Sequence, residues 1–527
     1  MSDVDRDRAA ATDGGGQARH GMIDRFLSLI EHVGNRLPDQ ATIFVILALL
    51  TLMGSWWAAA AQLSIQHPVT KEMITVTNLL TREGLQWVFG SVVTNFTGFA
   101  PLGTVLVAMI GVGVAERTGL FTALLKALVR SVPAKLVTPT IVFAGIMSNV
   151  ASDAGYVILP PLAAMLYASL GRHPIAGIAA AFAGVAGGFS ANLLLSTLDP
   201  MLAGLTETAA RLYDSKYTVN AACNYYFMAA SVALLVVAGW LVSVRFVEPR
   251  LGPWRPQLSG AGDADSAELA PLSTEERRGL IAAGIALAVT VAAILALVLP
   301  QNGVLRDLKT GGIDPFYKSL VPLILIVFLV PGVAYGIVTR HVRSDKDASR
   351  MMGQTIGTMG GYIVMAFFAA QFIEWFKKSN LGLIIALEGA AFLQSIHLTG
   401  VPLLVGFVAL TALINLLISS ASAKWAILAP IFVPMLMVLG KSPEVTQALY
   451  RVGDSVTNTI TPLNVYFPIL IAYMHRYDAK AGMGTLIACM VPYSVVFFLV
   501  WVVFVVGWGM LGAPLGPDSP LLYTPAR

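Results

Sequence analysis

The sequence predicts an all-α polytopic membrane protein, and three observations lead to this fold class. Of its 527 residues, 56% are hydrophobic and only 12% are charged, a composition typical of membrane proteins and not of soluble enzymes. Apolar stretches close to the roughly twenty residues that cross a bilayer recur along the chain. A proline-broken segment with charged residues occurs twice. Such pairs are typical of inverted-repeat secondary transporters, so we expect two re-entrant helical hairpins.

The N-terminal part of the chain predicts a tail, a surface helix and a first span. Residues 1–20 contain no apolar run and are expected to be a cytoplasmic tail without a cleavable signal. Between Met22 and Arg36 apolar residues recur at helical spacing with charges opposite, which predicts a helix along the inner membrane surface. Ala41–Leu63 is the first expected span, with two tryptophans near its outer end as interfacial anchors.

Loop charges predict the orientation. The polar loop 66–86 has few basic residues and is expected outside, and Phe96–Val114 then returns to the inner side. Lysines and arginines cluster in 117–135 and again in 340–350, and the positive-inside rule places both clusters in the cytoplasm. We therefore expect a multi-pass membrane protein with a cytoplasmic N-terminus.

A polar, Gly- and Pro-containing interruption divides the chain into halves. Several of the later apolar stretches are too short or too broken to be simple spans. The expected organisation is a cytoplasmic tail and surface helix at 1–40, a first transmembrane half at 41–247, a cytoplasmic linker at 248–278, a second transmembrane half at 279–515, and a C-terminal tail at 516–527.

The two broken segments are Asn149–Pro200 and Asn415–Pro468. Each is apolar, contains a short polar break of small residues, and then reaches a proline, Pro200 or Pro462. Backbone groups freed by such breaks are tolerated in a membrane only where protein or a water-filled cavity satisfies them. We expect a hairpin followed by a broken helix in each half, in opposite membrane orientation, with the hairpin tips meeting near the midplane.

An internal repeat supports this interpretation. Sliding the sequence by 269 positions places Asp153 on Ser422 and Gly184 on Gly453, and the match runs from Asn149 without a gap as far as Gly184. Matched broken segments in two halves are the best sequence-level indication of a transport site.

Arg451 and Asp454 are the most prominent charges in the second segment. They are three residues apart, so they share a helix face and can pair. A charge at the bilayer centre costs roughly 2.5–3.5 kcal/mol on insertion scales, so it is rarely present without a partner or a task. One interpretation is a structural salt bridge. The other is that Arg451 binds a ligand carboxylate while Asp454 titrates or binds an ion.

Asp199 is the corresponding acid of the first segment. It precedes Pro200 at a break, so it is either a helix cap or a proton- or sodium-binding group facing the cavity. No basic residue lies within one helical turn along the chain. Desolvation raises the pKa of an unpaired carboxyl group, so Asp199 is predicted to be protonated more easily than Asp454.

Further residues complete the predicted site. Trp425, with Ser422 one helical turn before it, is expected to stack on an aromatic ligand, or else to be a packing residue. Pro462 at the second break joins the predicted substrate-binding set. Lys424 is expected to snorkel to the surface. Asn149, Asp153 and Asn464 are candidate oxygen ligands for a sodium ion, which is the only cofactor considered.

These motifs resemble a known family. Ser-Ser-Ala-Ser-Ala-Lys-Trp at 419–425, Tyr-Arg-Val-Gly-Asp-Ser at 450–455 and Ser-Thr-Leu-Asp-Pro at 196–200 resemble the p-aminobenzoyl-glutamate transporter (AbgT) family. The resemblance implies a homodimer, nine transmembrane helices and two hairpins per subunit, and a water-filled bowl open to the cytoplasm. It also implies transport of p-aminobenzoyl-glutamate-like folate fragments, with export of sulfonamide antimetabolites by some members.

Other functions find less support in the sequence. The chain has no GxxxxGK[ST] phosphate loop, no His/Cys cluster with metal-ligand spacing and only two cysteines, so an ATP-driven pump or an enzyme is not expected. A small net charge of +4 gives no reason to expect a nucleic-acid partner. The alternative function is a di- or tricarboxylate carrier or a Na⁺/H⁺ exchanger on a related hairpin repeat. The direction of transport and the choice of H⁺ or Na⁺ stay open.

Overall fold

The computed structural model describes residues 38–66, 71–130, 133–151, 154–254 and 272–525. The predicted N-terminal tail and surface helix, Asp153, and most of the predicted linker lie outside these residues. Within them the chain is almost entirely helical, with one short antiparallel hairpin in which Ile65 pairs with Ile74.

The elements of the first half run as far as Leu251. They are α3 (Gln40–Ala60), β1 (Ser64–Gln66), β2 (Met73–Thr75), α4 (Arg82–Thr97), α5 (Ala100–Arg117), α6 (Leu120–Arg130), η1 (Ala134–Leu136), α7 (Val137–Ser148), η2 (Asn149–Ala151), α8 (Ala154–Ser169), α9 (Pro174–Phe182), η3 (Ala183–Gly187), α10 (Leu198–Ala210), α11 (Tyr225–Val242), η4 (Ser243–Val247) and α12 (Glu248–Leu251).

The elements of the second half begin at Thr274. They are α13 (Thr274–Val298), α14 (Asp314–Lys318), α15 (Leu320–Val338), α16 (Asp345–Thr358), α17 (Gly360–Lys378), α18 (Leu381–Ser395), α19 (Gly400–Asn415), α20 (Ala421–Val438), α21 (Pro443–Val456), α22 (Phe467–His475) and α23 (Met483–Met510).

The all-α polytopic fold class is confirmed. Within the described ranges, seven helices are long and apolar enough to cross a membrane, or eight if α16 and α17, bent by 49°, form one span. Helix α13 is the least buried of the seven: a capping box at Ser273 starts it, and only 11% of its apolar window is buried by the rest of the chain, as expected for a lipid-facing helix.

Some expected boundaries differ from the structure. The predicted outer loop 66–86 contains the β1–β2 hairpin and the start of α4, which Thr81 caps by accepting a hydrogen bond from the amide of Gly84. The long apolar stretch at 382–420 is divided between two helices, α18 and α19, because the chain turns at His397 and Gly400, both with positive φ. The first half continues as helix to Leu251, so the interruption between the halves is shorter than expected.

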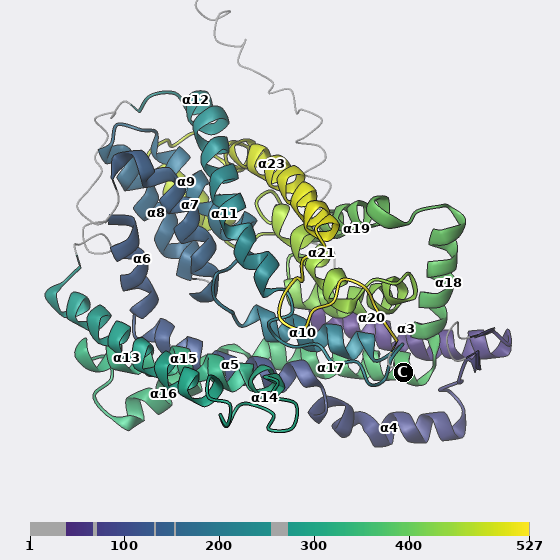
Figure 1. Cartoon of the computed structure of the whole chain (residues 1–527). Coiled ribbons are helices and arrows are strands. Elements are labelled where there is room, and N and C mark those ends of the chain that lie inside the picture. The colour runs from purple at the N-terminus through teal and green to yellow at the C-terminus, as the bar shows by residue number, and fades with distance from the viewer. Residues whose placement is uncertain (1–37, 67–70, 131–132, 152–153, 255–271, 526–527) are drawn as a thin grey trace, which may run out of the picture.

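The helices form two groups (Figure 1). Helices α5, α13, α15 and α16 lie side by side along the lower part of the view, and α13 and α5 each pack on α15. Helices α7, α8, α9, α11 and α23 stand above them, and α10, α20 and α21 lie between this group and α17. The broken segments of both halves therefore meet near the middle of the chain's packed core.

The internal repeat is visible in the helix boundaries. Four boundaries in the first half recur 269 positions later, at the offset that the sequence predicts: the helix ends Ser169 and Val438, the starts Pro174 and Pro443, the ends Gly187 and Val456, and the starts Leu198 and Phe467. Pro200 therefore corresponds to a position inside α22 and not to Pro462. The inverted orientation of the halves stays a prediction.

The turn that precedes each broken helix is where the repeat departs from the predicted match. Asn149 donates its Nδ2 to the carbonyl of Val185, and Asn415 donates its Nδ2 to the carbonyl of Asp454. Val185 and Asp454 are equivalent at the offset of 269, whereas the two asparagines are 266 apart. The counterpart of Asn149 is therefore Asn415, and the turn of the second repeat is three residues longer, which the gapless match did not anticipate.

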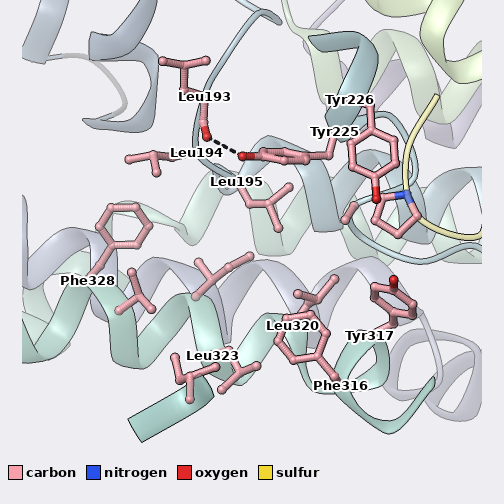
Figure 2. Close-up of a pocket in the computed structure, with 15 residues that line it drawn as sticks. Leu193, Leu194, Leu195, Tyr225, Tyr226, Phe316, Tyr317, Leu320, Leu323 and Phe328 are labelled. Carbon is pink, nitrogen blue, oxygen red and sulfur yellow. Dashed lines mark hydrogen bonds between the residues drawn. The ribbon is translucent and has the colours of Figure 1, made fainter. Parts of the chain in front are cut away.

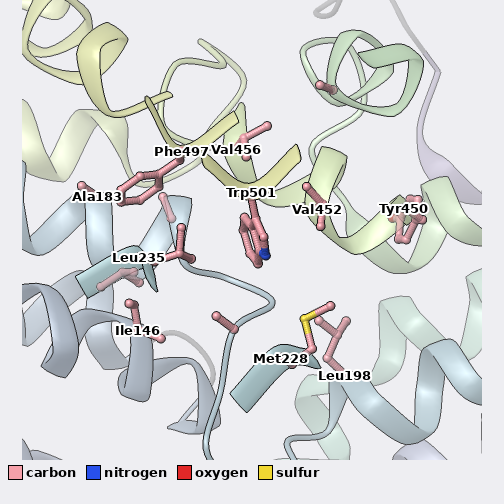
Figure 3. Packing of buried hydrophobic residues seen from close by; sticks show 14 of the residues in the cluster. Ile146, Ala183, Leu198, Met228, Leu235, Tyr450, Val452, Val456, Phe497 and Trp501 are labelled. Carbon is pink, nitrogen blue, oxygen red and sulfur yellow. The ribbon is translucent and has the colours of Figure 1, made fainter. Parts of the chain in front are cut away.

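The core where the halves meet is built around α23. Figure 3 shows Trp501 between Leu235 of α11 and Val452 of α21, with Phe497 one turn away beside Ala183. Trp501 is fully buried and its Nε1 donates to the Ser231 hydroxyl at 2.8 Å, so the indole polar group is satisfied inside the core. Helix α23 therefore holds the two broken helices together.

Two equivalent glycines allow close helix packing, and this can be tested. A Cβ at Gly184 would lie 2.5 Å from the carbonyl oxygen of Val142, and one at Gly453 would lie 2.5 Å from that of Val408. Because backbone must move in both cases, we expect Gly184→Ala and Gly453→Ala each to lower the stability by about 1–3 kcal/mol. The measurement is the temperature at which detergent-purified protein loses its monodisperse chromatographic peak.

The matched control for these substitutions is Gly406→Ala in α19, where a Cβ would meet no atom within 4 Å. This variant should keep or slightly raise the transition temperature, since alanine favours a helix over glycine. Equal behaviour of all three variants would show that close packing at the repeat does not limit stability.

Candidate functional site

Residues from both repeats line a small cavity where the two breaks meet. Its volume is about 150 Å³, and its lining comes from α8, both breaks and the second hairpin turn: Tyr156, Phe189, Ser419, Asn458, Asn464, Val465 and Tyr466. The rings of Tyr156 and Tyr466 stack at 4.0 Å between centroids, so the first repeat touches the second through an aromatic pair. The cavity is the expected meeting point of the broken segments.

Arg451 forms an ion pair with Asp199 and not with Asp454. Its Nη1 lies 2.6 Å from Asp199 Oδ1, and its Nη2 donates to the Ser190 carbonyl at 3.0 Å. Both charged side chains are almost fully buried. The predicted pairing with Asp454 is wrong because the guanidinium group of Arg451, two turns into α21, points across to α10 and the first break and not along its own helix.

Asp199 is therefore a paired carboxylate. Its second oxygen accepts from the amide and the hydroxyl of Ser196, at 2.6 and 3.0 Å, so it binds residues before the helix and does not cap α10. The prediction that Asp199 is the more easily protonated acid assumed that it lacked a cationic partner. That assumption is wrong, because Arg451 is 252 residues away in sequence but in direct contact. The role of Asp199 in ion coupling stays a prediction.

Lys424 and Asp454 form a second buried pair. Nζ of Lys424 lies 2.5 Å from Asp454 Oδ1, and it also donates to Asn415 Oδ1 and to the carbonyl of Ile418. The side chain of Lys424 is fully buried, so the expectation that it snorkels to the surface is wrong. The ammonium group instead joins the turn of the second hairpin to α21, and each charge compensates the other.

Trp425 is fully buried between residues of both repeats. Its ring stacks on Tyr450 at 4.3 Å between centroids, and its Nε1 donates to Thr206 of α10 at 2.9 Å. This is the arrangement of a packing tryptophan, as the alternative interpretation predicted. Ser422 is half-buried on the same helix, 3.4 Å from the Ser420 hydroxyl. Substrate contact by Ser422, Trp425 or Pro462 stays a prediction.

The predicted sodium ligands do not form a described cluster. Asn149 donates to the carbonyl of Val185, and its Oδ1 is buried without a hydrogen-bond partner. Asn464 lines the cavity but uses its Nδ2 on the carbonyl of Asn458. Asp153 lies outside the described residues. Across the described part of the chain, no group of three His, Cys, Asp or Glu side chains is placed to hold a metal ion.

Several residues of the site were not predicted from sequence. Ser190 accepts from Arg451 through its carbonyl, and its amide donates to Ser455 at 3.2 Å. Asn415 binds the carbonyl of Asp454 and the side chains of Thr457 and Asn458. Ser190 is at the first polar break, and Asn415 binds residues of the second, so the breaks were the available signal. Their partners depend on how the halves pack.

A larger apolar cavity lies beside the first break. It has a volume of about 430 Å³ between the 193–195 loop and helices α11, α13, α14 and α15. In Figure 2 the leucines of the loop face Leu320 and Leu323 across the cavity, and the Tyr225 hydroxyl donates to the carbonyl of Leu193 at 2.9 Å. The lining residues are uncharged, which separates this cavity chemically from the ion pairs.

Comparisons with known proteins place these features in context. A model of the AbgT putative transporter family matches residues 25–523. The p-aminobenzoyl-glutamate transport protein of Escherichia coli (strain K12) is 39% identical over 490 residues, covering 93% of this chain and 95% of that protein.

Two solved transporter structures resemble the whole fold. The YdaH transporter of Alcanivorax borkumensis, described as having an unusual topology, is 45% identical with a TM-score of 0.86, covering 91% of this chain and 100% of that chain. MtrF of Neisseria gonorrhoeae, described within a class of antimetabolite efflux pumps, is 45% identical with a TM-score of 0.89, covering 94% and 100%.

The Lys424–Asp454 pair should be essential for stability. Lys424→Met leaves a buried carboxylate without compensation, and breaking a buried pair in this way costs about 3–5 kcal/mol. The double variant Lys424→Met/Asp454→Asn removes both charges and should recover part of that loss. The measurement is the thermal stability of the wild type and of both variants, purified in detergent.

The control for this cycle is Arg350→Ala, which removes one partner of an exposed pair with Asp347. It should change the stability by less than about 1 kcal/mol. A Lys424→Met protein as stable as the wild type would contradict the conclusion that the ammonium group compensates Asp454.

Proposed function

Since the chain belongs to the AbgT putative transporter family, we propose that it is an ion-coupled secondary transporter of p-aminobenzoyl-glutamate and similar folate fragments. The observation behind this substrate is the 39% identity to the E. coli p-aminobenzoyl-glutamate transport protein over 93% of the chain. The relationship to MtrF, described within a class of antimetabolite efflux pumps, supports sulfonamide antimetabolites as further export cargo.

Unsatisfied buried donors at the centre of the fold favour an anionic ligand. Nε of Arg451 and the hydroxyl of Ser190 are both buried without a hydrogen-bond partner, although the two residues touch each other. Leaving a buried polar group unpaired costs free energy, and a planar carboxylate suits a guanidinium group. We propose that a glutamate carboxylate of the substrate binds these donors and displaces part of the Arg451–Asp199 pair.

The neighbouring cavity offers a place for the aromatic part. Tyr156 and Tyr466 stack beside Asn458 and Asn464, so an aminobenzoyl ring would meet both aromatic faces and amide groups. At about 150 Å³ the cavity is smaller than the roughly 300 Å³ or more typical of ligand pockets. Binding must therefore open it, and the two breaks and the second hairpin turn are segments that border it. We also propose Ser422, Trp425 and Pro462 as second-repeat contacts in the opened state.

The cellular setting follows from charge and relatives. We propose a multi-pass protein of the bacterial inner membrane with a cytoplasmic N-terminus, based on the basic residues of 117–135 and 340–350. A homodimer is proposed from the family resemblance. Coupling to H⁺ or Na⁺ is proposed because Asp199 and Asp454 are one acid per repeat, and Asn149, Asp153 and Asn464 offer oxygen atoms to Na⁺.

A carrier of simple di- or tricarboxylates is the second candidate, because Arg451 would serve any carboxylate. Competition in reconstituted vesicles separates the two functions. Unlabelled p-aminobenzoyl-glutamate should compete with its labelled form, sulfamethazine should compete partly, and succinate should not. Competition by succinate alone would favour the second candidate.

Substitution of Arg451 tests the ligand contact. Arg451→Ala should abolish transport of p-aminobenzoyl-glutamate and reduce that of a neutral sulfonamide less, because the guanidinium group serves the carboxylate. Arg451→Lys should not rescue fully, since an ammonium group lacks the bidentate fork. Vesicle uptake of both labelled compounds is the measurement.

The double variant Arg451→Ala/Asp199→Asn controls for the acid that Arg451→Ala leaves unpaired. It should regain stability without regaining carboxylate transport. Equal loss of both cargo classes in the double variant would favour a purely structural ion pair.

A further inference from the structure

Glu444 is a buried carboxyl group without a counter-charge. Three carboxylates are buried in the described part of the chain, and two of them, Asp199 and Asp454, pair with cations. Glu444, in the first turn of α21, is 2% exposed, and no Lys, Arg or His nitrogen of the described residues lies within 4.0 Å of its oxygens. Its carboxyl group accepts from Tyr217, whose hydroxyl lies 2.9 and 3.2 Å from the two carboxyl oxygens, and from the Ser442 hydroxyl.

We propose that Glu444 is a further proton-binding site that couples transport to pH, and that its protonation favours binding of an anionic substrate at Arg451. The coupling rests on the proposed function, whereas the proton site itself does not.

The surroundings of Glu444 suit a group that changes its charge. Burial without a counter-charge favours the neutral acid. The N-terminus of α21 and the donated hydrogen bond of Tyr217 favour the carboxylate. Burial and these two stabilising contacts therefore act in opposite directions on the same carboxyl group. Asp199 and Asp454 differ, because each has a cation in contact.

A seam of polar side chains joins Glu444 to the candidate site. On α21, Glu444, Gln447 and Arg451 follow at three and four residues, so they share one helix face of about 10 Å length. Helix α10 and the segment after it supply the partner of each: Asp199 binds Arg451, Thr206 binds Gln447 at 2.6 Å, and Tyr217 binds Glu444. The partners come later in the sequence as the α21 residues that they bind come earlier. The two segments therefore run antiparallel.

The seam is also linked to the surface and to the second hairpin. Tyr217 is half-buried and packs against Tyr523, whose hydroxyl binds Asp214. A phenol hydroxyl both donates and accepts, so it can pass a proton between solvent and the carboxyl group. In the middle of the seam, Thr206 accepts a hydrogen bond from Trp425 of α20. A change at Glu444 therefore reaches residues of both repeats.

Other charged and titratable groups around Glu444 are already engaged or lie farther along the seam. Cys223 is buried and accepts from Gln447, and Lys441 precedes α21 without forming an ion pair to Glu444. On α10, Glu207 pairs with Arg211. Helices α19 and α23 contribute no Asp, Glu, Lys, Arg or His, and Lys424 of α20 is bound to Asp454.

The sign of the coupling follows from charge. An ionised Glu444 places a negative charge about 10 Å from Arg451 and repels an incoming carboxylate, while a protonated Glu444 does not. Protonation and substrate binding therefore favour each other, and by reciprocity the affinity for the anion falls as pH rises.

The test uses full-length protein in lipid nanodiscs and p-aminobenzoyl-glutamate. The wild-type affinity should fall by roughly five-fold or more between about pH 5.5 and about pH 8.5. Glu444→Gln, which keeps the shape and stays neutral, should bind with the low-pH affinity throughout. Glu388→Gln, the same change at an exposed acid, should behave as the wild type. An undiminished pH dependence in Glu444→Gln overturns the coupling.

An infrared pH titration decides the proton site without any substrate. The wild type should show a protonated carboxyl band that disappears as pH rises and that Glu444→Gln lacks. Tyr217→Phe should move the midpoint of this band to higher pH, because it removes a donor that favours the carboxylate. If no band is lost in Glu444→Gln, the proton site is overturned. Failure of the wild type to bind p-aminobenzoyl-glutamate would count against the proposed function alone.

Discussion

The guanidinium group of Arg451 is the contact on which the arrangement of the two halves depends. It pairs with Asp199 of the first repeat and also holds the Ser190 carbonyl at the first break, so one buried cation from the second repeat organises the interrupted backbone of the first. The Lys424–Asp454 pair does the same within the second repeat. Because an uncompensated charge is costly in the interior, neither broken segment can take its native form without its partner.

A pair of asparagines and a pair of glycines at equivalent positions also shape the two repeats. Asn149 and Asn415 each satisfy the carbonyl of the equivalent position, Val185 or Asp454, where a helix is interrupted or ends. Gly184 and Gly453 let the preceding hairpin arm approach the broken helix to a distance that leaves no space for a Cβ. The asparagine hydrogen bonds and the close glycine contacts therefore support irregular backbone whose polar groups lipid could not satisfy.

The sequence was sufficient for features that depend on local pattern. Hydropathy predicted the fold class, and the offset of 269 predicted helix boundaries of the second repeat from those of the first. The sequence was insufficient where tertiary packing decides which side chains pair with each other. Helical spacing made Arg451 and Asp454 neighbours, but the partner of Arg451 is on another helix. Glu444 follows Ser442 and Pro443 as an ordinary first-turn acid does, so nothing local indicated that it is buried.

The position of Lys424 makes the two related halves unequal. At the offset of 269 its counterpart is Gly155, so the first repeat has no cation at this position, and the Oδ1 of Asn149 is left without the partner that Lys424 gives to Asn415. Two halves that exchanged shapes by symmetry alone would have equal energies in either arrangement. Here the charge at this position belongs to one half only. A transporter that exchanged the shapes of these halves would therefore have two states of unequal free energy, even with equal solutions on both sides of the membrane.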